Sequence, residues 1–177
     1  MRWKTVEAAI VGVSFAAILH AQVSDLPGWG KTKWGMKPQE VLDLYRAEGA
    51  ANYSPRTGKP ERLEIKIEHF KVVNQDFTVE FRFDEDFGLD LVGFTPQDAQ
   101  KKLSSSDVRD LFTSLEKALT EKYGTATFSN NVQGQSKRSW MLGSTKINLT
   151  AIWAPEGSGL GGFLSLTYTR ASVEKGL

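Results

Sequence analysis

The chain has 177 residues, a length typical of one domain, and its 40% hydrophobic and 24% charged residues are those of a folded globular protein rather than a disordered or collagen-like one. Its 22 basic and 21 acidic residues leave a net charge of +1, so charge favours neither nucleic acid nor an anionic membrane surface as a partner. The sequence has no cysteine, which excludes disulfides, cysteine-ligated zinc, iron–sulfur clusters, thiol catalysis and a lipid-carrying cysteine.

The first residues have the pattern of a secretory signal peptide. Two positive charges, on Arg2 and Lys4, precede an uncharged apolar run of twelve residues at 8–19. That run is shorter than the about 20 residues that span a bilayer as a helix, and it is typical of the apolar region of a signal. We therefore predict a signal peptide over residues 1–21, cleaved after Ala21, and a secreted or periplasmic protein. The alternative is an uncleaved membrane anchor.

The segments after the signal predict a linker and then a short helix. Residues 22–33 contain Gly and Pro without hydrophobic periodicity, as linkers do. Pro38 suits the first turn of a helix, helical spacing follows it, and Gly49 ends the pattern. A helix is therefore expected over 38–47, and a loop over 50–60.

The hydrophobic period then changes from 3.6 to 2, which predicts β-strands. Three strands joined by tight turns, over 63–72, 77–83 and 89–94, would form an antiparallel meander. The alternation reverses its parity after His69, so a β-bulge is expected at that residue.

A second helix and a second set of strands follow. Ser104 and Asp107 resemble a capping box, and an apolar stripe at helical spacing predicts a helix over 105–123 that Gly124 ends. Residues 171–177 are expected to form a disordered tail. The expected strands are 125–129, 137–142, 145–153 and 163–169.

This order of elements predicts an α+β fold, with residues 34–170 as a single α+β domain. Helices packed on one face of an antiparallel sheet would make a two-layer sandwich, and the doubled order leaves room for two αβββ repeats. A chain of this size buries roughly 70% of its unfolded surface, enough for one core without disulfides or metals.

The segment WGMKPQEVLDLY, Trp34–Tyr45, resembles the helix entry Gly-Met-(Thr/Ser)-x-x-(Glu/Gln)-Val of small bacterial envelope domains. It is similar to the entry in the small lipoprotein of the outer-membrane β-barrel assembly machine and in β-lactamase-inhibitor-like proteins. The resemblance implies αβββ units, an envelope location and a role in protein–protein contact. Lys37 stands where those families have a capping Thr or Ser, and the resemblance carries no functional residue to this chain.

The motifs in the chain do not assemble a catalytic set. A G-x-G-x-x-G run at 157–162 precedes strand formers instead of a helix, so it is read as a hairpin loop. The acidic run Asp84–Gly88 is read as a solvated turn, with weak calcium binding as the alternative. His69 is the one histidine that follows the predicted signal, and a structural role is favoured for it. We therefore predict no enzyme activity, no cofactor and no metal site.

The sequence thus predicts an exported non-enzymatic domain that contacts another envelope or secreted protein, in assembly or as an inhibitory accessory. Trp29 and Trp34 are the candidate partner-binding residues, because aromatic side chains in loops often anchor contacts. Trp140 and Trp153 fall within strands and are expected in the core.

Two other classes of function stay open, and so does the oligomeric state. A periplasmic carrier of a small apolar ligand or lipid needs a closed apolar cavity of several hundred Å³ between helix and sheet. A hydrolase that uses carboxylates alone would have to bring Asp84, Asp86 and Asp90 together in a cleft.

Overall fold

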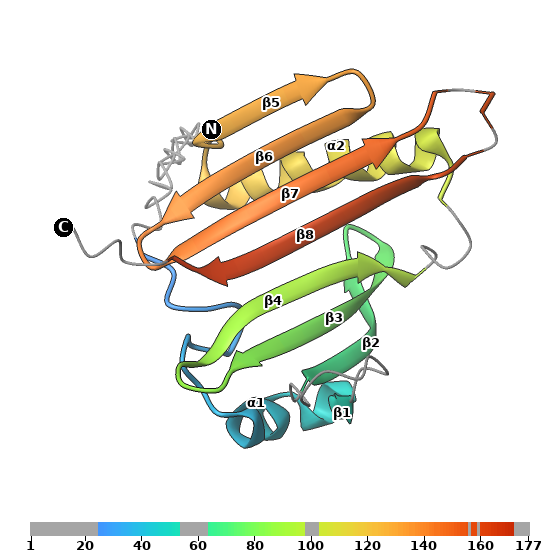
Figure 1. The fold of residues 1–177 in the computed structure, drawn as a ribbon. Helices are drawn as coiled ribbons and strands as arrows, with labels where there is room; N and C mark the ends of the chain where they lie inside the picture. The colour runs from blue at the N-terminus through green and yellow to red at the C-terminus, as the bar shows by residue number, and fades with distance from the viewer. Residues whose placement is uncertain (1–24, 54–63, 98–102, 156, 159, 172–177) are drawn as a thin grey trace, which may run out of the picture.

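The computed structural model describes residues 25–53, 64–97, 103–155, 157–158 and 160–171, and the predicted signal peptide lies outside them. Within these ranges, one antiparallel sheet of eight strands, in the order β1-β2-β3-β4-β8-β7-β6-β5, dominates the fold (Figure 1). The strands are β1 (Ala51–Tyr53), β2 (Glu64–Val72), β3 (Gln75–Asp84), β4 (Gly88–Pro96), β5 (Phe128–Val132), β6 (Gln135–Leu142), β7 (Thr145–Trp153) and β8 (Gly162–Arg170).

Both predicted helices form. The helices of the described residues are α1 (Pro38–Leu44), the short 3₁₀ turn η1 (Arg46–Glu48) and α2 (Ser105–Tyr123). Gly49, with φ 83°, ends η1, and the Ser104 side chain accepts a hydrogen bond from Asp107 N at 3.1 Å, which confirms the capping box. No helix in the described part of the chain is long and apolar enough to cross a membrane.

The predicted two-layer sandwich, with helices covering an antiparallel sheet of two αβββ repeats, is wrong. β4 pairs antiparallel with β8, so the two groups of strands form one continuous sheet. Only two α-helices occur among the described residues, and α1 has 7 residues, too few for a covering layer. Periodicity predicts single strands, but it does not show which strands pair across the chain. The result is a sheet-dominated fold with four strands in each half.

The two faces of the sheet differ in what covers them. The core face carries the alternating apolar residues of the strands, and α2 packs on it against β7 and β8. In the other half, Trp29 and Tyr45 pack over Phe81 on the same face. In Figure 1, α2 passes behind β6 and β7. We call the opposite side the open face, because neither described helix covers it.

The β-bulge predicted at His69 is confirmed. The register between β2 and β3 shifts between Ile67 and Phe70, and His69 has φ 57°. Histidine tolerates this left-handed conformation better than most residues do. Its side chain is exposed, so the structural role of His69 lies in its backbone rather than in a buried hydrogen bond.

The first described residues, in the segment predicted as a linker, bind the turn between β6 and β7. The carboxylate of Asp25 accepts hydrogen bonds from Ser144 N at 2.9 Å and Ser144 Oγ at 3.0 Å. The hydroxyl of Thr145, which is buried, donates to Leu26 O. Trp34 Nε1 donates to the same Thr145 Oγ1 at 2.7 Å. These bonds connect the start of the domain to its C-terminal half.

These contacts give a pH-dependent prediction for Asp25. The hydrogen bonds from Ser144, the backbone one first, hold the pKa of the Asp25 carboxyl below its ordinary value of 3.8. A lowered pKa in the folded state means that the stabilisation is fully present above pH 3.8 and is lost as the pH falls through the folded-state pKa. Asp25→Asn is therefore expected to lower the free energy of unfolding near neutral pH, with a deficit that shrinks below pH 3.8. Urea unfolding at a series of pH values measures this, and a deficit independent of pH would contradict it.

Candidate functional site

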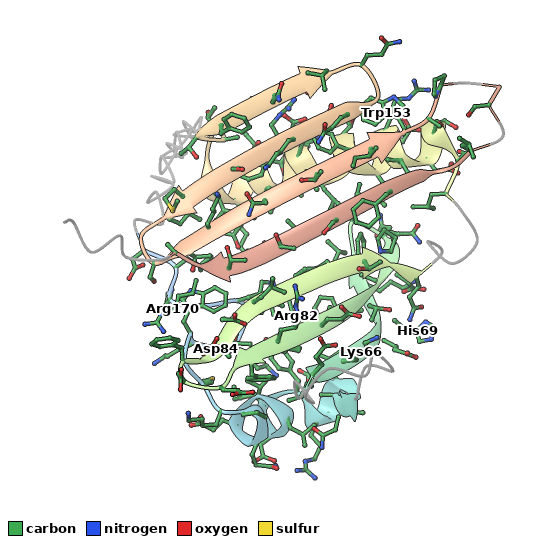
Figure 2. The ribbon with its side chains drawn as sticks, in the orientation of Figure 1. Lys66, His69, Arg82, Asp84, Trp153 and Arg170 are labelled. Atoms are coloured by element: carbon green, nitrogen blue, oxygen red, sulfur yellow. The ribbon has the colours of Figure 1, made fainter. Side chains whose placement is uncertain are left out.

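A hollow of about 560 Å³ lies at one end of the sheet, where β7 ends and the first turns of α2 pass. Trp153, the last residue of β7, marks this end in Figure 2. The hollow is lined by α2, the β5–β6 turn and the residues at and after the end of β7, namely Arg109, Gln133, Gly134, Ile152, Trp153, Ala154 and Pro155.

Backbone contacts fix the walls of this hollow. Trp153 N donates to Gly134 O at 2.9 Å, so the β5–β6 turn is joined to the end of β7. Gly134 has φ 79°, and a Cβ there would lie 3.0 Å from Trp153 O, so a glycine suits both the turn and the close approach. Ser105 Oγ donates to Ala154 O at 2.8 Å and joins the start of α2 to the same segment. The hollow is thus preformed by three elements of the fold.

Exposed apolar side chains border the hollow on the open face. Ile152 and Phe163 lie directly opposite each other in the β7–β8 register and are 48% and 51% exposed. We call this adjacent pair, Ile152 and Phe163, the apolar rim. Adjacent apolar side chains that are left exposed mark interaction sites more often than single ones do.

The chemistry of the hollow and the apolar rim suits binding. The ionisable group among the lining residues is the Arg109 guanidinium, which donates hydrogen bonds and accepts none. The indole of Trp153 and the amide of Gln133 add an aromatic surface and a second polar group. Trp and Arg are enriched among residues that dominate protein–protein affinity. In the described ranges, no three His, Cys, Asp or Glu side chains gather as a metal site would require.

The two predicted partner-binding residues lie elsewhere. Trp29 is half-buried and stacks on Tyr45 with ring centroids 5.7 Å apart, and its ring also meets those of Phe70, Phe81 and Phe94 at 5.1–5.9 Å. Trp34 is half-buried as well, with its indole nitrogen bonded to Thr145. The structure does not bring either residue to the hollow, and both pack against the core.

The hydrophobic periodicity of the sequence identifies only some of the residues that line the hollow. Trp140 is buried as expected, whereas Trp153 is half-buried and lines the hollow. Ile152 occupies the polar phase of β7, in line with Asn148 and Thr150, so an apolar side chain there breaks the alternation. Such a break at the end of a strand is the sequence signal for this site.

The other candidate sites have structural explanations. The carboxylate of Asp84 accepts hydrogen bonds from Asp86 N at 2.9 Å and Phe87 N at 3.1 Å, so it closes the turn. Between α2 and the sheet, the side chains of Leu115 and Leu149 are fully buried. The hollow at the sheet end is a different feature from the closed cavity that a carrier needs.

Comparisons with known proteins add one distant likeness. No family model matches the chain, and no curated protein matches it. A solved structure, described as a DUF4309 family protein (YjgB) from Bacillus subtilis subsp. subtilis str. 168, is 9% identical to this chain. The alignment covers 86% of this chain and 96% of that one, with a TM-score of 0.41.

Proposed function

We propose that the chain is an exported, non-enzymatic domain that acts by binding another protein through the hollow and its apolar rim. The observation that carries the proposal is the juxtaposition of a preformed hollow, lined by Trp153 and Arg109, with the half-exposed pair Ile152 and Phe163. A partner side chain that enters the hollow would meet an aromatic surface and a hydrogen-bond donor. The proposal of export rests on the signal-like pattern of residues 1–21.

The energetics favour a protein partner at this site. Covering the apolar rim removes apolar surface from water, which stabilises a complex by roughly 25 cal/mol per Å². A hollow of about 560 Å³ is large enough to admit side chains of a partner loop. Because its walls are already joined by backbone hydrogen bonds, binding costs little ordering of this chain.

The proposal is tested by affinity capture from the native envelope, followed by mass spectrometry. Ile152→Glu places a charge in the apolar rim and is expected to reduce recovery of the partner roughly tenfold or more. The matched control is Met141→Glu, because Met141 is 49% exposed against 48% for Ile152 and lies on the same open face. N-terminal sequencing of the processed chain should begin near Gln22.

Two results would contradict the proposal. One is a set of captured proteins that Ile152→Glu leaves unchanged. The other is an equal loss in both variants, which would indicate a general effect of added charge on the open face. Thermal unfolding of both variants checks that each still folds.

A further inference from the structure

Among the described residues, β5 is the outermost strand of the C-terminal half of the sheet and pairs with β6 along one side (Figure 1). All five of its residues are exposed. The other outer strand, β1, has three residues. An outer strand presents backbone N–H and C=O groups that can pair with a further strand, and proteins usually keep such edges short or block them.

Three common protections of an outer strand, namely charged residues, proline and a bulge, do not occur in β5. Residues 124–136 include no Lys, Arg, Asp, Glu or Pro. The register with β6 runs without a shift from Phe128 opposite Ser139 to Val132 opposite Gln135, so no bulge twists this edge away. Among the described residues, β6 is the strand that pairs with β5, and no bulge interrupts the outer edge of β5.

Contacts with the rest of the fold hold β5 in a fixed position. Asn131 Oδ1 accepts hydrogen bonds from Ser136 Oγ at 2.9 Å and from Arg138 Nη1 at 2.8 Å. Arg138 also forms an ion pair with Glu116 of α2 at 2.5 Å. Because these bonds connect the outer strand to the helix behind the sheet, pairing would not have to order a loose strand first.

The polarity of the β5 side chains is symmetric about Asn130, with an apolar residue at each end of the strand. Phe128, Asn130 and Val132 share the open face, with two apolar residues around a central amide. Phe128 is 49% exposed and Val132 is 52% exposed. Antiparallel pairing of this strand with itself, centred on Asn130, places Phe128 opposite Val132 and Asn130 opposite Asn130.

We propose that β5 pairs antiparallel with β5 of a second copy of this chain, around a two-fold axis at Asn130. The pairing buries each Phe128 against Val132 of the other copy and joins the two sheets into one of sixteen strands, eight from each copy. The uncharged edge brings no like charges together, which suits a surface that must complement itself. The open faces of both copies then lie on the same side of the joined sheet.

The first test uses the absence of cysteine from the sequence, because Asn130→Cys then introduces a single thiol. Opposite residues in antiparallel strands have Cα atoms about 4.5–5.5 Å apart, within the about 4.4–6.8 Å that a disulfide spans. With oxidised glutathione as the oxidant, Asn130→Cys is expected to form a covalent dimer. Phe128→Cys should not, because its counterpart lies four residues along the strand, at roughly 13 Å. Asn52→Cys, on the β1 edge, is the control for random collision.

The second test uses charge. Asn130→Lys and Asn130→Asp each place like charges at the axis, and each is expected to weaken the dimer roughly tenfold or more in analytical ultracentrifugation. A mixture of the two variants should restore a mixed dimer. Asn52→Lys on the other outer strand should leave the dimer unchanged.

Three results would overturn the proposal. A monomer at all accessible concentrations would leave the edge to a strand of a different protein. A dimer that ignores both Asn130 charges would indicate another interface, and equal cross-linking of the Asn130→Cys and Asn52→Cys variants would indicate random collision. None of these results depends on the hollow, so the proposed function is tested separately.

Discussion

Replacing Trp140 by alanine is expected to lower the free energy of unfolding by about 3–5 kcal/mol, the range for a large aromatic side chain removed from a core. Trp140 is 1% exposed and is the largest of the fully buried side chains. Its Nε1 donates to Gly124 O at 2.8 Å, at the residue that ends α2. The substitution therefore leaves both a cavity and an unsatisfied helix-end carbonyl, and urea unfolding measures their combined cost.

Trp140→Phe separates the two contributions. Phenylalanine keeps most of the buried volume but cannot donate to Gly124, so we expect a cost of about 1–3 kcal/mol, that of an unsatisfied buried acceptor. The hydrophobic cavity accounts for the remainder in Trp140→Ala. If both variants cost the same, the cavity would contribute nothing, and this account of the core would be wrong.

Gly88→Ala is expected to lower the free energy of unfolding by about 3 kcal/mol or more. Gly88 has φ 70°, and a Cβ there would lie 2.4 Å from Gly35 O and 2.8 Å from Met36 O. Those atoms belong to a backbone held in place, since Leu89 N donates to Met36 O at 2.9 Å and Gly35 N donates to Leu89 O at 3.0 Å. To make room for the Cβ, either these hydrogen bonds must lengthen or the backbone of the turn before β4 must shift.

Gly49→Ala is the matched control, because Gly49 has φ 83° and nothing lies within 4 Å of its Cβ position. It keeps the cost of a left-handed conformation, roughly 1–2 kcal/mol, without the clash. The difference between the two variants in urea unfolding gives the cost of the close approach alone. Equal costs would show that Gly88 is required for its conformation only.

Local structure was predictable where sequence chemistry and periodicity act over a few residues. The capping box at Ser104 and the bulge at His69 both form as expected. Pairing between distant strands was not predictable from the sequence, because the β4–β8 register depends on how the two halves of the sheet fit together. The loop predicted over 50–60 contains the strand Ala51–Tyr53, because three residues do not establish a period.

The candidate site was less predictable than the fold. Trp29 and Trp34 are predicted to anchor contacts from loops, yet tertiary packing half-buries both. The hollow depends on Arg109 and Trp153, which are 44 residues apart and come together only through the packing of α2 on the sheet. Only Ile152, an apolar residue in a polar phase, marked the site locally.

The pairing of β4 with β8 has a consequence for the order in which the chain can complete its fold. When Phe94 has been synthesised, its partner Leu166 is still 72 residues away, and so the inner edge of β4 stays unpaired. At about 5–20 residues per second, this interval is roughly 4–14 s. The hydrogen bond from Ser144 N to the Asp25 carboxylate likewise cannot form until Ser144 has been synthesised. Because β8 is the last described strand, the growing chain stays incompletely folded until that strand has been synthesised.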